Sequence, residues 1–257
     1  MTACITGATA GIGLAFAEEL AAEGSDLVVV ARDDARLGAL AARLTAQHGI
    51  TVEVLRADLA TDAGCTAVMD RLADESNPID VLVNNAGFGV NQAFVAGSLA
   101  DEERLLDVLV RATLRLTHAV LPGMVQRGRG TVINVSSVAG WVPIGTYSAA
   151  KSWVTVFTES LGSELSGTGV TATAVCPGFT RTEFHERADM DVAAFPEWAW
   201  LDARRVARDG LRAARAGRSV SVPSTRYSAL ALAVQLTPRP LLRRASSVVS
   251  RAGITGR

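Results

Sequence analysis

The sequence predicts an α/β fold in which one doubly wound parallel β-sheet of about seven strands carries helices on both faces. Short apolar runs alternate with longer stretches of helical periodicity along most of the chain, which is the pattern of successive βαβ units. The apolar runs are continuous, as in Asp26–Ala31 (DLVVVA), and this is typical of strands that are covered on both faces. No repeat, low-complexity run or clear linker interrupts the alternation, so we expect a single domain over residues 1–257.

Each predicted element follows from its length and periodicity. The apolar runs are short enough for strands, whereas the stretches between them repeat their apolar residues at helical spacing. The predicted strands are Ala3–Thr6, Asp26–Ala31, Thr51–Arg56, Ile79–Val83, Thr131–Val135, Val170–Val175 and Ser219–Val222. The predicted helices are Gly11–Glu23, Asp33–Gln47, Thr61–Ala73, Asp101–Gln126, Tyr147–Leu165 and Ala203–Ala216. Two segments break the pattern: residues 183–201 are irregular and rich in large apolar side chains, and the tail 238–257 is mildly basic.

Composition excludes several classes of protein. Of the 257 residues, 49% are hydrophobic and the net charge is −1, which argues against disorder and removes the electrostatic reason to expect a nucleic-acid partner. The three cysteines lie far apart without a C-x-x-C pair, so neither a disulfide framework nor a zinc site is expected. The first residues lack a basic region followed by an apolar core, so no signal peptide is expected. We expect a cytoplasmic protein without membrane contact.

The use of lysine is unusual. Of the 25 basic residues, 24 are arginine, and Lys151 is the single lysine. Tyr147, one of two tyrosines, lies four residues before it in a predicted helix, so both side chains share one helix face. Chance placement is the alternative, but the pairing with a rare tyrosine favours a chemical role.

A glycine-rich turn follows the first predicted strand and opens the first predicted helix. Its sequence is Thr6-Gly7-Ala8-Thr9-Ala10-Gly11-Ile12-Gly13. Glycines permit a tight turn and a close approach of the backbone to a pyrophosphate, which the free N–H groups of the helix N-terminus would bind. An ordinary loop is the alternative, but the position between strand and helix favours a nucleotide site.

Together with further motifs in the same order, this turn resembles that of the short-chain dehydrogenase/reductase superfamily. The other motifs are Asp58-Leu59, Asn84-Asn85-Ala86-Gly87, Ser136-Ser137, Tyr147-x-x-x-Lys151 and Pro177-Gly178. The resemblance covers roughly residues 1–225 and implies a Rossmann-like fold and hydride transfer between a nicotinamide cofactor and a carbonyl/alcohol pair. The cofactor-binding residues that it implies are Gly7, Thr9, Gly11, Ile12, Gly13, Arg32, Asp58, Leu59, Asn85, Ala86, Gly87, Tyr147, Lys151, Pro177, Gly178, Thr180 and Thr182.

The end of the second predicted strand bears on the choice of cofactor. An acidic residue there would bind the ribose 2′-OH of NAD. The residue in this position is Arg32, whose planar cation suits the 2′-phosphate of NADP and favours NADP(H). Asp33 and Asp34 follow directly and keep NAD(H) as the alternative. Ala10 stands where many NADP-binding relatives carry a second basic residue.

The resemblance assigns the catalytic roles to Ser137, Tyr147 and Lys151. Tyr147 would exchange a proton with the substrate oxygen, and Ser137 would hold that oxygen by a hydrogen bond. The Lys151 ammonium and the positive nicotinamide ring would lower the pKa of the tyrosine below its ordinary value of about 10. Lys151 would also reach the nicotinamide ribose, for which an arginine is a poor replacement.

Two departures from the family pattern stand out. The spacing of ten residues between Ser137 and Tyr147 is shorter than usual, so the loop between them should reshape the pocket. Leu109 stands where the family usually has an asparagine that helps to hold a water beside the lysine. Leucine cannot hydrogen-bond this water, so proton exchange could be rebuilt from backbone groups, slowed or lost. Core packing is the simpler role for Leu109.

Residues 183–201 fall where the family places its substrate-binding loop, and the substrate is predicted to be a small apolar carbonyl or alcohol. The predicted substrate-binding residues are Ser137, Trp141, Phe184 and Trp198, with Phe195 and Trp200 as further candidates. Ordinary core packing is the alternative for these aromatic residues. The predicted helix Asp101–Gln126 and the catalytic helix resemble the family's dimer face, so we expect a homodimer or homotetramer. A binding protein that senses NADP(H) with little turnover is the alternative function, and Leu109 favours it.

Overall fold

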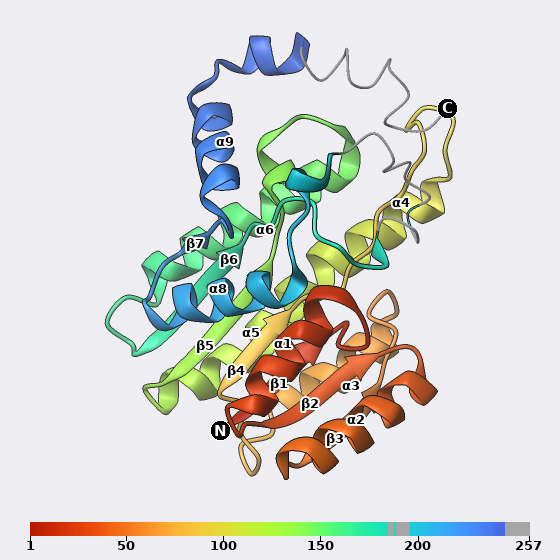
Figure 1. Cartoon of the computed structure of the whole chain (residues 1–257). Coiled ribbons are helices and arrows are strands. Elements are labelled where there is room, and N and C mark those ends of the chain that lie inside the picture. Colours follow the sequence, from red (N-terminus) through yellow and green to blue (C-terminus); the bar gives the residue numbers. More distant parts are fainter. Residues whose placement is uncertain (185–187, 189–195, 245–257) are drawn as a thin grey trace.

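The computed structural model describes residues 1–184, 188 and 196–244, and these form one seven-stranded sheet (Figure 1). The predicted segments 183–201 and 238–257, and Phe195 within the first, therefore lie wholly or partly outside the described residues. The strands are β1 (Thr2–Thr6), β2 (Asp26–Ala31), β3 (Val52–Arg56), β4 (Val81–Asn84), β5 (Gly130–Val135), β6 (Val170–Val175) and β7 (Val220–Ser221). All pairs are parallel, and the order β3-β2-β1-β4-β5-β6-β7 confirms the predicted doubly wound α/β fold.

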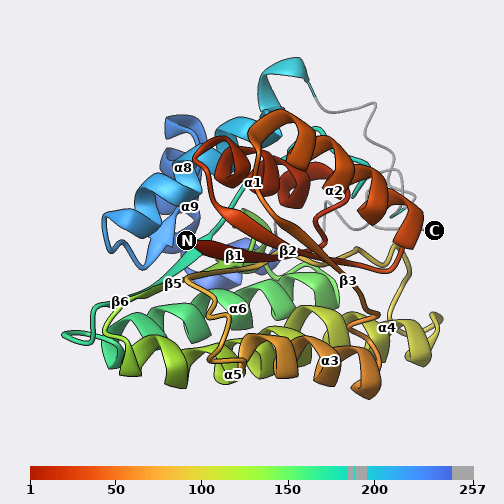
Figure 2. The same cartoon turned by 90° about the horizontal axis from the view of Figure 1, so that it is seen from below.

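Helices cover the sheet in two layers (Figure 2). The first layer holds α1 (Gly11–Ala22), α2 (Asp34–His48) and α8 (Ala203–Arg215), and the second holds α3 (Asp62–Leu72), α4 (Leu99–Leu106), α5 (Thr113–Gln126) and α6 (Gly145–Glu164). A π-helical turn, η1 (Asp107–Ala112), joins α4 to α5. The continuous run Leu99–Gln126 is long and apolar enough to cross a membrane by length and composition alone, but its buried side chains pack in the core under the sheet.

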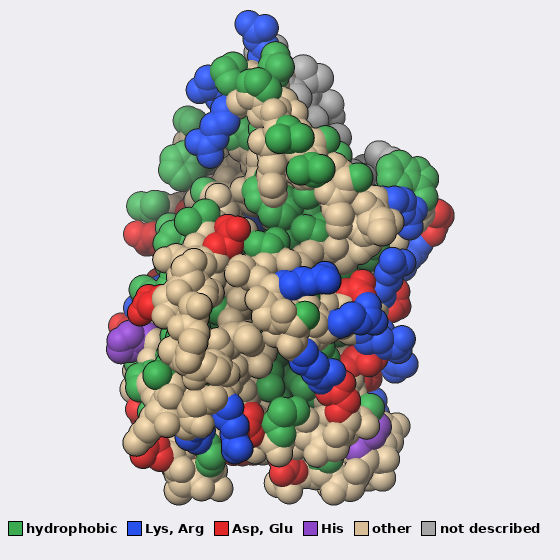
Figure 3. All heavy atoms as spheres, turned by 90° about the vertical axis from the view of Figure 1, so that its left-hand side faces the viewer, with side chains coloured by type: hydrophobic (Ala, Val, Ile, Leu, Met, Phe, Trp, Pro, Cys, Tyr) green, Lys and Arg blue, Asp and Glu red, His purple; other side chains and the backbone are tan. Residues whose placement is uncertain are grey.

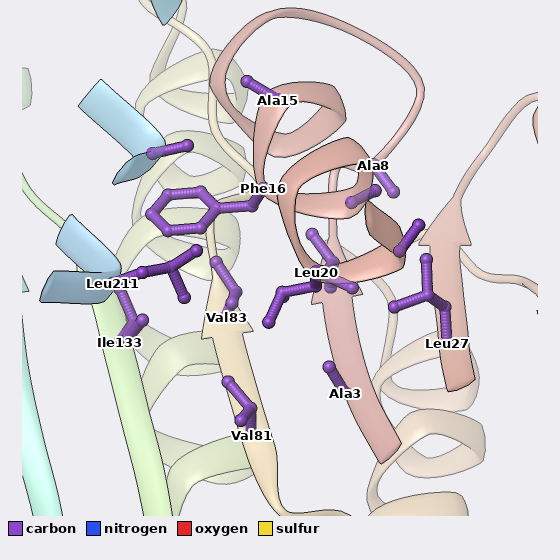
Figure 4. Close-up of a cluster of buried hydrophobic side chains, with 14 of the residues drawn as sticks. Ala3, Ala8, Ala15, Phe16, Leu20, Leu27, Val81, Val83, Ile133 and Leu211 are labelled. Atoms are coloured by element: carbon purple, nitrogen blue, oxygen red, sulfur yellow. The ribbon is translucent and has the colours of Figure 1, made fainter. Parts of the chain in front are cut away.

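Two hydrophobic cores explain why the strand sequences are continuously apolar. In β1, Ala3 lies on the side of α1 and α8, where Phe16 and Leu211 complete the first core (Figure 4). Ile5 belongs to the same core. Cys4 points to the opposite core beneath α3 and α5. Each large side chain buried in this way contributes about 1.5–3 kcal/mol to the free energy of unfolding.

The element boundaries differ from the prediction where capping or packing decides them. The helix predicted from Asp33 begins at Asp34, because the Asp33 carboxylate caps it by accepting a hydrogen bond from Arg36 N at 3.0 Å. The long helix predicted over Asp101–Gln126 is interrupted by η1. A further helix, α9 (Thr225–Leu236), follows β7. It was not predicted, because its apolar residues form no distinct stripe along the helix.

The strand order places the functional side chains. It reverses between β1 and β4, and in such sheets ligands bind beyond the carboxyl ends of the strands at this point. The loops after β1, β3, β4, β5 and β6 all open at this edge, and they carry the sequence motifs other than Tyr147-x-x-x-Lys151, which lies on α6.

Candidate active site

A cavity of about 1360 Å³ runs along the carboxyl edge of the sheet. It exceeds the range of roughly 300–1,000 Å³ that is usual for small-molecule sites, so it has room for a dinucleotide and a substrate. On the face that carries α9, hydrophobic side chains gather around the upper part of the molecule (Figure 3). Leu230 of α9 lines the cavity and is itself 53% exposed. The cavity therefore combines a polar floor at the strand ends with an apolar upper wall.

The three glycines of the turn after β1 leave no room for a side chain. Gly7 and Gly11 have φ values of +67° and +56°, which favour glycine, and a Cβ on Gly13 would lie 2.3 Å from the Gly7 carbonyl oxygen. The turn leads directly into α1, whose N-cap residue Ala10 provides no side-chain cap. The first N–H groups of α1 are thus free of side-chain competition and fit a pyrophosphate.

Asn85 holds this turn against the loop after β4. Its side-chain amide donates to the carbonyls of Thr6 (2.9 Å) and Gly7 (3.2 Å), while the Thr6 hydroxyl accepts from the N–H groups of Asn85 and Ala86, both at 3.0 Å. The predicted neighbour of the ribose is therefore also a structural link between two motifs that lie far apart in the sequence.

Two arginines that the sequence analysis did not single out shape the adenosine end. Arg104 of α4 donates to the Asp58 carboxylate at 2.8 Å, and the Ala60 N–H also donates to it at 3.1 Å. Burial acts to raise the pKa of Asp58, but these hydrogen bonds and the nearby Arg32 charge hold the pKa below its ordinary value. Asp58 at the cavity wall is thus paired with Arg104 and lies within the electrostatic influence of Arg32.

Arg36, in the first turn of α2, crosses to the loop after β6. Its guanidinium pairs with both carboxylate oxygens of Glu183, at 2.7 and 3.1 Å, and contacts the Thr9 carbonyl at 3.3 Å. No local sequence signal links Arg36 to Glu183, because the two residues are 147 positions apart. This pair ties three segments together at the rim of the glycine-rich turn.

The catalytic residues meet between β5 and α6. Lys151 is 5% exposed and its Nζ donates to the Val135 carbonyl at 2.7 Å, with the Tyr147 ring centroid 5.7 Å away. Ser137 lies close enough to Tyr147 to act on the pKa of its phenol, and its hydroxyl accepts from the Ala139 N–H at 3.1 Å. The structure therefore brings together the three residues that the sequence analysis proposed as catalytic.

The pKa of Tyr147 differs from the prediction. Burial raises the pKa of Tyr147 to about 12, with the Ser137 hydrogen bond acting in the opposite direction, and burial lowers the pKa of Lys151 to about 8. The lowering of the tyrosine pKa that was predicted with the nicotinamide cofactor bound is not seen in the protein without it. The reason is that the ammonium is directed at the Val135 carbonyl and desolvation of the phenolate dominates.

Leu109 lies in η1 and is 1% exposed. A Cβ on Gly87 would lie 2.7 Å from Leu109 Cδ2 and 3.9 Å from Lys151 Nζ, so the leucine packs beside the buried lysine. The Thr113 hydroxyl donates to the Leu109 carbonyl at 2.9 Å. The core-packing role considered for Leu109 is therefore realised.

Most of the predicted site residues reach the cavity. The predicted residues that line it are Gly7, Thr9, Gly11, Ile12, Arg32, Asp58, Leu59, Asn85, Ala86, Gly87, Ser137, Tyr147, Lys151, Pro177, Gly178, Thr180, Thr182 and Phe184. Gly13 instead packs against Gly7, and Trp141 and Trp198 are not among the lining residues. The assignment of both tryptophans to the substrate site is thus not supported: Trp141 closes the short helix η2 (Val138–Trp141), and Trp198 is 64% exposed.

Trp200 also lies apart from the cavity lining. Its ring packs against Phe179 with centroids 5.9 Å apart, and the Arg181 guanidinium lies 5.6 Å from its centroid. The lining residues that the sequence analysis missed are mostly apolar, and they include Phe88, Val90, Leu105, Val142, Ile144 and Tyr227.

Comparison with known proteins agrees with this arrangement. A family model described as short chain dehydrogenase matches residues 1–192. The chain belongs to the short-chain dehydrogenase/reductase family. It is therefore an oxidoreductase by family, as the motifs predicted.

Several short-chain dehydrogenases are similar over most of their length. Sulfoacetaldehyde reductase 2 of Chromohalobacter salexigens is 37% identical over 185 residues, which are 70% of this chain and 73% of that protein. A short-chain dehydrogenase from Sphingobium yanoikuyae, solved in complex with NADPH, is 38% identical with a TM-score of 0.83, covering 91% of this chain and 93% of that one. The bulky-bulky ketone specific alcohol dehydrogenase from Comamonas testosteroni is 33% identical with a TM-score of 0.79, covering 91% and 92%.

Proposed function

We propose that the protein is an NADP(H)-dependent oxidoreductase that interconverts an apolar ketone and its secondary alcohol. The observation that carries the proposal is the meeting of Ser137, Tyr147 and Lys151 at the boundary between the polar floor and the apolar wall of one cavity. A substrate carbonyl at this boundary would reach both hydroxyl groups while its carbon skeleton stays on apolar side chains.

The protein's own residues supply the proton and the orientation. The bound cofactor supplies the hydride. Ser137 holds the substrate oxygen, and the Tyr147 hydroxyl, which is protonated because burial raises its pKa to about 12, donates a proton to that oxygen during reduction. Lys151, anchored by the Val135 carbonyl, places a cation beside the tyrosine and favours the phenolate that remains.

The geometry around β2 favours NADP(H) over NAD(H). Arg32 lines the cavity beyond the strand end. Asp33, the rival ligand for a ribose 2′-OH, is engaged as the N-cap of α2 through the Arg36 N–H. The similar Sphingobium yanoikuyae enzyme, which was solved with NADPH, supports the same choice.

The apolar wall favours a substrate with substantial hydrocarbon on both sides of the carbonyl. The short loop after Ser137 contributes Val142, Pro143 and Ile144 to the lining, to which Phe88 and Phe184 also belong. The similar Comamonas testosteroni alcohol dehydrogenase is named for its specificity toward bulky-bulky ketones. Both lines of support point to ketones rather than to small polar aldehydes.

The experiment is a panel of aliphatic, aromatic and cyclic ketones and alcohols, followed by nicotinamide absorbance with NADPH, NADH and their oxidised forms. Turnover of a bulky ketone with NADPH that is lost in Tyr147→Phe would support the proposal. Tight NADPH binding with no turnover across the panel would refute it and support the NADP(H) sensor, for which Leu109 beside Lys151 is the favouring observation.

We also propose that the protein forms a homodimer through the outer faces of α5 and α6. Leu114 and Val125 of α5 are exposed by 43% and 41%, and Val156 of α6 is exposed by 63%. Light scattering would test this, with Val156→Asp as the variant expected to lower the measured mass. A monomeric wild-type protein would refute it.

A further inference from the structure

Tyr227 is buried at the site without a role in the chemistry described above. It lies in the first turns of α9, its side chain is 8% exposed, and it lines the cavity. Tyr227 belongs to none of the motifs described above. Its contacts nevertheless connect α9 to the loop after β6, which carries the Pro177-Gly178 motif.

The Tyr227 hydroxyl joins two segments. It accepts a hydrogen bond from the Phe179 N–H at 3.2 Å and donates one to the Ala199 carbonyl at 2.7 Å. The same segments are paired further on, where the Leu201 N–H donates to the Phe179 carbonyl at 2.7 Å and the Arg181 N–H donates to the Leu201 carbonyl at 3.0 Å. The hydroxyl therefore closes one end of a short ladder between the loop after β6 and residues 199–201.

The Tyr227 ring explains why residue 178 is glycine. A Cβ on Gly178 would lie 2.1 Å from Cζ of the ring, a distance that no real contact allows. Gly178 is not one of the glycines with positive φ, so its backbone conformation does not require glycine. The tyrosine ring fills the space that a side chain at this position would need, so only glycine fits here.

This packing extends to the catalytic serine. The Pro177 carbonyl, directly before Gly178, accepts a hydrogen bond from the Val138 N–H at 3.1 Å and contacts the Ser137 hydroxyl at 3.5 Å. A shift of the Gly178-Phe179 backbone would therefore move the wall that faces Ser137. The residues that define the adenosine end, Arg32 and Asp58, lie on the loops after β2 and β3 instead.

We propose that Tyr227 is a positioning residue for the nicotinamide half of the cofactor. It fixes the Gly178-Phe179 backbone from behind, and this backbone forms the cavity wall next to Ser137. The inference rests on the proposed function, because it assumes that a nicotinamide dinucleotide occupies this cavity. It goes beyond that function because it states that a residue outside the catalytic group determines how the nicotinamide half of the cofactor binds.

The test compares a whole cofactor with its adenosine half. Tyr227→Phe keeps the ring and removes the hydroxyl, and the matched control is Ser228→Ala, which removes a hydroxyl that bonds to the Val222 and Ser224 carbonyls. Dissociation constants are measured by fluorescence for NADPH and by calorimetry for adenosine 2′,5′-bisphosphate. Tyr227→Phe is expected to weaken NADPH binding about tenfold, the loss that corresponds to one hydrogen bond. Binding of adenosine 2′,5′-bisphosphate is expected to stay at the wild-type value, and Ser228→Ala should change neither constant.

A second variant approaches the same contact from the other side. Gly178→Ala directs a methyl group at the Tyr227 ring and should show the same selective loss, even if Tyr227→Phe does not fold. Equal weakening of both ligands, or unchanged NADPH binding, in a folded variant would overturn the inference. If the wild-type protein bound adenosine 2′,5′-bisphosphate but not NADPH, or bound neither, the proposed function would fail first and the inference with it.

Discussion

Burial of the single lysine predicts an unusual dependence of stability on pH. The pKa of Lys151 falls from an ordinary 10.5 to about 8 in the folded protein, because burial disfavours the ammonium. Between these two values the unfolded chain binds more protons than the folded one, so the free energy of unfolding rises with pH across this window. The pKa shift corresponds to a cost of roughly 3 kcal/mol for burying the charged lysine. This cost lowers the free energy of unfolding in full below pH 8 and disappears by about pH 10.5.

The assay is urea unfolding of the wild-type protein and of Lys151→Met between pH 7 and pH 10. Methionine keeps a long unbranched side chain and removes the charge. Burial also raises the pKa of Cys4 to about 12 and of Cys176 to about 11, so these thiols lower stability above pH 9, but they are present in both proteins and largely cancel in the difference.

As the pH rises from 7.5 to 10, the free energy of unfolding of the wild-type protein is expected to increase by about 2–3 kcal/mol relative to that of Lys151→Met. The catalytic activity of Lys151→Met should be lost at every pH, since the cation beside Tyr147 is gone. Parallel stability profiles of the two proteins would refute the reasoning, because they would mean that the lysine ionises equally in the folded and unfolded states.

Three further changes test the site. Gly13→Ala should abolish cofactor binding and lower the free energy of unfolding by about 1–3 kcal/mol, measured by thermal melting, because its Cβ would lie 2.3 Å from the Gly7 carbonyl oxygen. Arg32→Ala should weaken NADPH binding by about 1.5–3 kcal/mol and leave NADH binding unchanged, and equal losses for both cofactors in a fluorescence titration would contradict the assignment of the 2′-phosphate. Leu109→Asn should cost about 1–3 kcal/mol of stability, since it buries an amide among apolar side chains. A rise in its turnover number would show that the leucine limits proton exchange, whereas unchanged turnover would show that backbone groups suffice.

The sequence predicted the sheet well, because its strands are covered on both faces and therefore read as continuous apolar runs. Asp26–Ala31 and Val170–Val175 were predicted to the residue. Helix α9 was missed, because its apolar residues are spread around the helix and because its tertiary contacts, such as those of Tyr227, come from segments distant in the sequence. Helical periodicity of apolar residues arises when one face of a helix is buried. A helix whose apolar residues are spread around its axis therefore has no periodic pattern to recognise in the sequence.

Prediction of the site succeeded where a motif is local and failed where the site is assembled in three dimensions. Tyr147 and Lys151 are one helical turn apart, and their spacing already implied a shared face. The pairing of Arg36 with Glu183 and of Arg104 with Asp58 joins distant segments and could not be seen in the sequence. The aromatic residues Trp141, Phe184 and Trp198 were assigned to the substrate site by chemical type alone. Of these, Phe184 lines the cavity, whereas Trp141 and Trp198 do not.

The structure gives a physical reason why an arginine-rich chain keeps one lysine. The Lys151 ammonium is enclosed, with the Val135 carbonyl as its acceptor and Gly87, Leu109 and the Tyr147 ring beside it. A guanidinium carries five N–H donors and is larger, so in this place it would leave several donors without acceptors and collide with the leucine. Its pKa also lies too high for burial to bring it near neutrality. Lys151→Arg should therefore lose both stability and activity, although it preserves the charge, and a folded, active arginine variant would show that charge alone is required.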